Sequence, residues 1–220
     1  MLTLALDTSQ RKIVLALLND GQILASHTET AEDTANALLQ GLDRLLQNTA
    51  TQLNQIQKVI WGCGPGSVTS LRIGAATLWG LFGARATLPE VCGVSSLLLR
   101  ALSLETNPTE AVCVAFKARQ KKVYAGFWED GQWVEACLTF AELQAQAQHR
   151  HWIHKIGPAW PEALGASLPS ETTDFTDPLS PKSFLKIPEK SISYKEKLNK
   201  NISLNYLQPL ADIAQPGASL

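Results

Sequence analysis

Two similar lobes of mixed α/β structure, each opening with a β-β-β-α unit, are the fold that the sequence predicts. Two segments of the chain, Leu4–Glu32 and Val114–Glu142, align without a gap at an offset of 110 residues. Each segment holds an Asp-Gly dipeptide between apolar runs, and helix-forming sequence follows each one. Asp-Gly in that setting is a strong signal for a tight β-hairpin, because both residues tolerate the positive φ that the turn requires.

The aligned segments share identical residues as well as the order of their elements. Each reads as an apolar strand, a polar turn, a second strand, the Asp-Gly hairpin, a third strand and then a helix. Two unrelated β-meanders could share this order, and the sequence leaves that alternative open. The identities are Gln10 with Gln120, Lys12 with Lys122, Asp20-Gly21-Gln22 with Asp130-Gly131-Gln132, and Ala31-Glu32 with Ala141-Glu142.

The passage between the repeats predicts helices and short buried strands in alternation. Apolar residues at i, i+3, i+4 and i+7 spacing indicate an amphipathic first helix, and Ser95 is a suitable helix cap. The predicted elements in order are helix 33–47, strand 58–61, a glycine-rich turn, a helix ending near residue 84, strand 90–94 and a helix that starts after Ser95.

The division of the chain follows from the repeat. We expect an N-terminal lobe over residues 1–108 and a C-terminal lobe over 109–220. Residues 169–201 are rich in Ser, Thr, Pro and Lys, which predicts an extended excursion. Apolar alternation returns at 202–207, and we expect the last residues to return to the first lobe.

Composition and charge limit the kinds of function that the chain is expected to have. The chain carries a formal net charge of -1 with 45% hydrophobic and 18% charged residues, as in ordinary soluble globular proteins. That charge gives no general attraction for nucleic acid or an anionic membrane. Charged residues interrupt the first apolar run, so we expect neither a signal peptide nor a membrane span. The 4 cysteines form no C-x-x-C pair, which suits reduced thiols in the cytoplasm and no zinc site.

The stretch "GCGPGSVTSLRIG", residues 62–74, has the composition of a phosphate-binding loop. A P-loop requires G-x-x-x-x-G-K-[S/T], and this stretch has neither that glycine spacing nor the lysine. The sequence therefore favours a tight strand-to-helix turn with Ser67 or Thr69 as the cap. A vestigial nucleotide or anion contact stays open as the alternative. Its residues would be Asp7, Thr8, Gly64, Gly66 and Ser67.

Asp7 is the one carboxylate at a position suited to ligand chemistry. It could orient Mg²⁺ or phosphate, or it could cap the Thr8-Ser9 turn through its side chain, which is the interpretation we favour. Its counterpart in the second repeat is Lys117. The acidic pair that two nucleotide-binding lobes would provide is therefore incomplete.

Two further clusters have simpler explanations than ligand binding. His149, His151 and His154 have nearly metal-like spacing, but no acidic or cysteine partner stands near them, so a surface run is favoured. Trp128 and Trp133 flank the second Asp-Gly hairpin. Cross-strand packing explains this pair better than stacking on RNA bases.

The residues "GPGSVTSLRIG", 64–74, resemble the "GPGSFTGLRIG" motif of the bacterial TsaB (YeaZ) family, with Val68 and Ser70 as departures. The resemblance extends from end to end of the chain. Further matching segments are "LALDTS" at 4–9, "GVSSL" at 93–97, "KKVYAG" at 121–126 and "NYLQP" at 205–209.

The resemblance implies a two-lobed actin-like ATPase fold of the ribonuclease H-like class. It also implies a non-catalytic paralogue of the TsaD enzyme. With TsaD and a small TsaE-type ATPase, members of the family support threonylcarbamoylation of the adenosine beside the anticodon in tRNAs that read ANN codons. The resemblance implies that tRNA is met only through the complex. It further implies that the chain has no cofactor of its own, with ATP or ADP held by partners or at the subunit interface.

In the family the contact with TsaD is a bundle of two helices from each protein. Here the helices would be 33–47 and 69–84, and a second copy of the chain could take the paralogue's place. Small residues on the second helix would permit close approach. The expected partner-binding residues are Leu38, Leu42, Leu45, Leu71, Ala75, Ala76, Leu78, Trp79 and Phe82.

This chain departs from the family pattern at residues that the resemblance places near the nucleotide cleft between the lobes, and not on the apolar faces of these helices. The family often has Asp-Ala-Arg at residues 117–119, where this chain has Lys-Ala-Arg, and His-Ser at 33–34, where it has Asp-Thr. His27 is the one histidine before residue 149, so the chain lacks the metal-binding histidine pair of the catalytic paralogue. The main alternative function is an independent ATPase or sugar kinase of the same superfamily. A peptidase has little support, since no nucleophile–base pair is evident.

Overall fold

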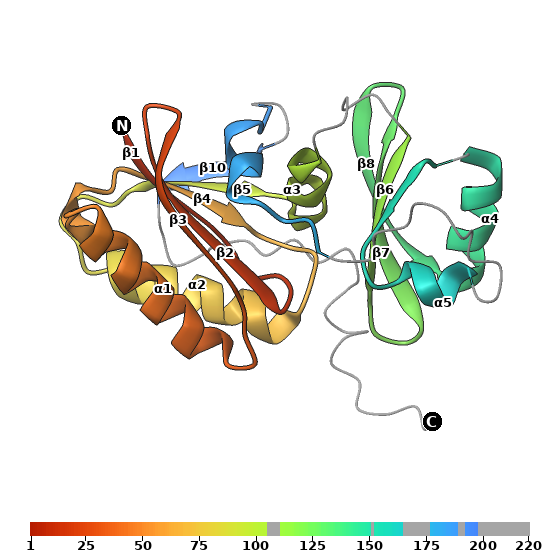
Figure 1. The fold of residues 1–220 in the computed structure, drawn as a ribbon, viewed down its shortest axis with the longest axis horizontal. Coiled ribbons are helices and arrows are strands. Elements are labelled where there is room, and N and C mark those ends of the chain that lie inside the picture. Colours follow the sequence, from red (N-terminus) through yellow and green to blue (C-terminus); the bar gives the residue numbers. More distant parts are fainter. Residues whose placement is uncertain (105–110, 151, 165–176, 189–191, 198–220) are drawn as a thin grey trace. The chain divides into compact units, whose positions relative to one another are not determined.

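The computed structural model describes residues 1–104, 111–150, 152–164, 177–188 and 192–197 (Figure 1). These residues form two compact units, each with its own β-sheet. The first unit contains residues 1–104 together with the described residues from 178 to 197, and the second contains 111–150, 152–164 and residue 177. Among the described helices, none has both the length and the apolar character needed to cross a membrane.

The first unit is built on a mixed sheet with the strand order β10-β5-β4-β1-β2-β3. Strands β1, β2 and β3 form an antiparallel meander, β4 and β5 run parallel to β1, and β10 pairs antiparallel with β5. The strands are β1 (Leu2–Asp7), β2 (Lys12–Asn19), β3 (Gln22–Thr30), β4 (Lys58–Gly62), β5 (Glu90–Val94) and β10 (Ile192–Lys197).

Helices α1 (Thr34–Asn48) and α2 (Val68–Phe82) lie side by side on one face of this sheet (Figure 1). Asp33 caps α1 by accepting hydrogen bonds from two backbone N–H groups of its first turn. The apolar faces of both helices pack on the inward-facing residues of β1, β2 and β4 and form the core of the first unit. Helix α3 (Ser96–Ser103) contacts the 3₁₀ helix η3 (Pro181–Leu185), and a second 3₁₀ helix, η1, covers Leu53–Gln55.

The second unit repeats the meander on a smaller sheet of order β8-β7-β6-β9. Helices α4 and α5 contact each other, and α4 packs on β7 and β8. Trp160 and Trp152 are buried in the core of this unit, and Trp160 Nε1 donates to the carbonyl of Cys113 at 3.3 Å. The elements are β6 (Val112–Lys117), β7 (Lys122–Glu129), β8 (Gln132–Thr139), α4 (Phe140–Arg150), β9 (His154–Ile156) and α5 (Trp160–Leu164).

The duplicated β-β-β-α fold predicted from the sequence is confirmed. The first two strands of each meander begin and end at positions 110 residues apart, Leu2–Asp7 with Val112–Lys117 and Lys12–Asn19 with Lys122–Glu129. Both Asp-Gly hairpins have positive φ at both residues, with values of 47° and 78° in the first and 49° and 72° in the second. Trp128 and Trp133 pack edge to face across the second hairpin, with centroids 5.3 Å apart.

The described part of the polar segment 169–201 differs from the expected excursion of the second lobe. Residues 181–185 form η3 against α3, and β10 completes one edge of the first sheet. Backbone pairing with β5 explains this return, since it depends little on the polar side chains that suggested an excursion. The proposed boundary near residue 108 and the apolar stretch 202–207 lie outside the described residues.

Replacing two helical glycines with alanine should change the free energy of unfolding in opposite directions. A Cβ on Gly41 of α1 would lie 2.5 Å from His27 Cδ2 and 2.8 Å from Leu15 Cδ1, whereas a Cβ on Gly80 of α2 would meet nothing within 4 Å. We expect Gly41→Ala to lower the free energy of unfolding by about 1–3 kcal/mol through overpacking. Gly80→Ala should raise it by about 0.5–1 kcal/mol through helix propensity. Urea unfolding followed by circular dichroism measures both, and equal effects would show that α1 is not held this close to β2 and β3.

Candidate functional site

The glycine turn, residues 62–67, joins β4 to α2 and packs closely against the turn between β1 and β2. Gly64 has a φ of 107°, which favours glycine. The N–H of Ser67 donates to the carbonyl of Ser9 at 2.7 Å. A Cβ on Gly66 would lie 2.3 Å from that same oxygen. Glycine is therefore required at Gly66 because the two turns touch there.

Protein groups already use several polar atoms of the glycine turn. The N–H of Gly64 donates to Ser96 Oγ at 3.1 Å, and the N–H of Ser96 donates to the carbonyl of Gly64 at 2.8 Å. Thr8 Oγ1 donates to the carbonyl of Ser70 at 2.9 Å. Ser67 is the cap of α2, accepting from the N–H of Ser70 at 3.4 Å. These bonds support the structural interpretation of the turn over an anion contact.

Asp7 closes the turn at the end of β1. Its Oδ1 accepts from the N–H of Ser9 at 3.0 Å and from the hydroxyl of Ser9 at 2.7 Å. This is the capping arrangement that the sequence favoured. The other oxygen, Oδ2, has no hydrogen-bond partner among the described residues. A Cβ on Gly62 would lie 2.0 Å from Oδ2, so the glycine at Gly62 makes room for the carboxylate.

Arg100 of α3 is the counter-ion of Asp7, and the sequence reasoning did not predict it. Its Nη1 lies 3.4 Å from Asp7 Oδ1 and donates to the carbonyl of Ser96 at 2.9 Å. Both side chains of the pair are fully buried, with 0% exposure. A signal was present in the sequence, since Arg100 stands between three leucines and the apolar pair Ala101-Leu102. A buried arginine needs a paired carboxylate.

The position equivalent to Asp7 in the second unit has the opposite character. Lys117 is about half exposed and forms an ion pair with Glu162 at 2.9 Å. Of the two positions that the repeat relates, the first therefore holds a buried carboxylate paired with Arg100, and the second holds a surface lysine.

Most of the side chains predicted to bind a partner on α1 and α2 face the interior of the first unit. Six of the nine side chains are buried within the first unit, because the apolar stripe of each helix packs on its own sheet. They are Leu38, Leu42, Leu45, Leu71, Leu78 and Phe82. Ala75 is half-buried against the same core, so it also belongs to the interior side of α2.

Four exposed residues of α1 and α2 are apolar or small, and we call them the two-helix surface. Polar side chains are exposed on the same helices, among them Gln40, Arg44 and Arg72. Ala76 and Trp79 of α2 were predicted and are exposed, and Leu39 of α1 was not predicted and is 51% exposed. Gly80 is also exposed on α2. This surface combines large apolar side chains with residues that have small side chains or none.

The cysteines and the histidine cluster were the other candidate ligands in the sequence. Cys63, Cys92 and Cys113 are buried, and burial raises the pKa of the Cys113 thiol well above its usual value, with Arg150 and Lys155 opposing that shift. None of the 4 cysteines, all within the described residues, forms a disulfide. His149 lies in α4 and His154 in β9, whereas His151 lies outside the described residues. No group of three metal-ligating side chains is found among the residues that the structure describes.

Comparison with known proteins agrees with this architecture. A family model described as TsaD, tRNA N6-adenosine threonylcarbamoyltransferase, matches residues 26–166. A tRNA threonylcarbamoyladenosine biosynthesis protein TsaB from Escherichia coli is 30% identical over 171 residues, covering 73% of this chain and 72% of that protein. The chain belongs to the TsaB (YeaZ) family.

Two further relatives support the same assignment. TsaB of Haemophilus influenzae is 37% identical over 123 residues, which cover 55% of this chain and 51% of that protein. This match therefore spans about half of the relative's length. The solved structure of YeaZ from Pseudomonas aeruginosa matches with a TM-score of 0.68 and 27% identity, covering 84% of this chain and 90% of that one.

The Asp7–Arg100 pair makes a prediction about stability. Arg100→Met would leave a buried carboxylate without its counter-charge, and we expect the free energy of unfolding to fall by about 3–5 kcal/mol. The double variant Asp7→Asn/Arg100→Met should lose less than the sum of the two single variants, since neither charge is then left alone. Urea unfolding measures all three.

Lys117→Met is the matched control, because it breaks the exposed Lys117–Glu162 pair in the related position of the second unit. Its effect should stay below about 1 kcal/mol. An Arg100→Met variant no less stable than this control would show that the buried pair does not hold the first unit together.

Proposed function

We propose that the chain is a non-catalytic subunit of tRNA threonylcarbamoyladenosine biosynthesis that acts by binding a TsaD-type catalytic paralogue. The complex modifies the adenosine next to the anticodon in tRNAs that read ANN codons. The observation that carries the proposal is the buried pairing of Asp7 with Arg100 at 3.4 Å. The family assignment supports the pathway. The Asp7–Arg100 pair supports the proposal that this subunit does not itself catalyse a reaction.

The charges of the two lobes support a binding role over an ATPase or kinase role. A nucleotide with bound Mg²⁺ needs carboxylates that are available to the metal or its waters. Asp7 is fully buried, paired with Arg100 and bonded to Ser9. Lys117 occupies the related position of the second repeat, and a cation there would repel Mg²⁺.

The two-helix surface is the proposed site for the paralogue. Leu39 and Trp79 offer exposed apolar area, and aromatic side chains are favoured at protein interfaces. Ala76 and Gly80 are exposed on the same helix as Trp79, which permits a partner helix to approach closely. In the absence of the paralogue, a second copy of the chain would cover this surface.

The remaining members of the complex follow from the same proposal. A small TsaE-type ATPase would act with the paralogue, and the tRNA would be engaged by the assembled complex rather than by this chain alone. ATP or ADP would be held by the partners or at the interface between subunits. Such a complex would work in the cytoplasm, where tRNA is modified.

Replacing Ala76 with arginine tests the two-helix surface. Ala76 is exposed, so the variant should fold with an unchanged melting temperature. An arginine buried without a partner at an interface costs about 2 kcal/mol or more, and we expect affinity for the TsaD-type paralogue to fall roughly 30-fold or more. Pull-down and calorimetric titration with the purified paralogue measure the loss.

Ala145→Arg is the matched control, since Ala145 is an exposed alanine of α4 in the second unit. This variant should bind the paralogue as the unaltered chain does and support the same level of tRNA modification. Equal affinities for Ala76→Arg and Ala145→Arg would mean that the partner binds elsewhere on the chain.

A further inference from the structure

Strand β3 lies at one edge of the first unit's sheet, and we call its residues 25–30 the open edge. Because β3 ends the strand order, no other described strand pairs with its outer side. Proteins usually protect such an edge from pairing with another chain by a lysine, a proline or a bulge. The register of β3 with β2 shifts only near the hairpin, between Leu17 and Leu18. Residues 25–30 contain neither lysine nor proline, so the open edge lacks these protections.

The hydrogen bonds to β2 determine which backbone groups of the open edge point outward. The N–H of Ala31 donates to the carbonyl of Arg11 at 3.0 Å, and the pairing with β2 continues without a shift along residues 25–30. In an antiparallel ladder the N–H and C=O of successive residues point alternately to one side and the other. Every second residue of the open edge therefore directs its backbone groups away from β2, and its side chain is exposed. These residues are Ser26, Thr28 and Thr30.

A second copy of the same strand would satisfy these outward groups in one antiparallel register. A two-fold axis through Thr28 places each Thr28 opposite its own counterpart and Ser26 opposite Thr30. All three residues then stand in hydrogen-bonded pairs, with about six backbone hydrogen bonds between the copies. Pairs of serine and threonine across neighbouring strands are also favourable. The open edge is thus complementary to itself, as a two-fold contact requires.

The same register brings complementary side chains together on the other side of the strand. His27 of each copy stands opposite Glu29 of the second copy, beside its own Glu29, whose Oε2 lies 3.1 Å from His27 Nε2. A protonated imidazole donates through both ring nitrogens, so it can bond to a carboxylate on each side. Opposite charges directly across two strands stabilise their pairing. The repeat-related positions of β8 hold Cys137 and Thr139, so the second unit lacks this pattern.

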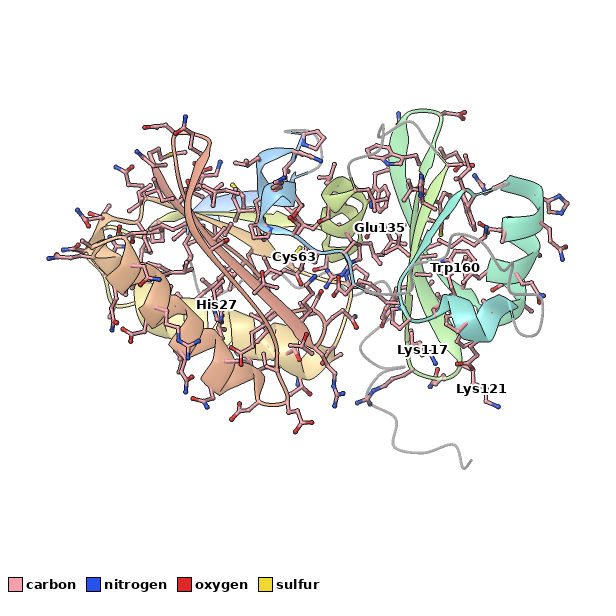
Figure 2. The ribbon with its side chains drawn as sticks, in the orientation of Figure 1. His27, Cys63, Lys117, Lys121, Glu135 and Trp160 are labelled. Carbon is pink, nitrogen blue, oxygen red and sulfur yellow. The ribbon has the colours of Figure 1, made fainter. Side chains whose placement is uncertain are left out.

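Helix α1 leaves room for the pairing. It contacts both β2 and β3, and Figure 2 shows His27 on the side of the sheet that α1 covers. A Cβ on Gly41 of α1 would lie 2.5 Å from His27 Cδ2. Since neighbouring strands are about 4.8 Å apart, the α1 helices of the two copies would lie about 10 Å apart. That is the distance at which two helices pack.

We propose that the open edge binds a second copy of this chain, with antiparallel pairing about Thr28 that joins the two first-unit sheets into one. A second copy is favoured over a peptide from another protein because one register matches both the outward backbone groups and the His27–Glu29 charges. None of the residues of β3 belongs to the two-helix surface. The inference therefore goes beyond the proposed function and does not depend on it.

Charges placed at Thr28 test the register, because this residue meets itself on the axis. All variants are made in the Ala76→Arg chain, in which contact between copies through the two-helix surface is weakened. Thr28→Lys and Thr28→Glu each place two like charges opposite each other, and we expect either to weaken self-association roughly tenfold or more. An equimolar mixture of the two should recover it, because lysine then faces glutamate. Sedimentation velocity over a range of concentrations measures association, and circular dichroism checks the fold.

Gln22→Lys is the matched control, since Gln22 is exposed on β3 but lies outside the open edge. It should associate as the Ala76→Arg chain does. The proposal is overturned if that chain stays monomeric, or if Thr28→Lys associates as well as the control. Failure of the mixture to recover association overturns the register about Thr28.

Hydrogen exchange gives a second measurement that needs no variant of the open edge. In the Ala76→Arg chain, raising the protein concentration should slow exchange of the outward N–H groups of Ser26, Thr28 and Thr30. Exchange of the N–H groups of Ala25 and His27, which already face β2, should change less. Equal exchange of the outward groups in dilute and concentrated protein would contradict pairing between copies.

Discussion

The buried ion pair between Asp7 and Arg100 is the constraint on which the first unit depends. It joins the end of β1 to α3, and Gly62 of β4 leaves the space that the carboxylate occupies. The same carboxylate orders the turn between β1 and β2 by accepting hydrogen bonds from Ser9. The carbonyl of Ser9 then accepts from the N–H of Ser67, which holds the glycine turn in place. A buried pair is costly to separate, since removing either partner leaves an unpaired charge in a medium of low dielectric.

This constraint links the fold to the proposed role. The glycine turn is fixed by protein groups at both ends, so α2 leaves it in a defined direction and lies beside α1. The interior side of the two helices packs in the core of the first unit. The two-helix surface on their outer side is the surface that we propose for the partner. The Asp7 carboxylate is held by Ser9 and Arg100 within the first unit.

The elements that could be predicted from the sequence are those set by local chemistry. The two Asp-Gly hairpins, the cap at Ser95 and the alternation of buried strands with helices all depend on neighbours in the chain. The pairing of Asp7 with Arg100 was missed because it joins residues 93 positions apart. The sequence could not show which apolar residues of α1 and α2 are buried, because an apolar stripe has the same periodicity whether it faces the protein's own sheet or another chain. β10 was missed because an edge strand is held by backbone bonds that leave little trace in composition.

The most direct test of the account is whether the isolated chain binds Mg²⁺ and nucleotide through Asp7. Calorimetric titration of the purified chain with Mg²⁺ and ATP should give no saturable binding, because the carboxylate is already paired with Arg100. Asp7→Asn should leave that result unchanged. Stoichiometric binding by the unaltered chain, lost in Asp7→Asn, would contradict the account and would favour an independent ATPase or sugar kinase.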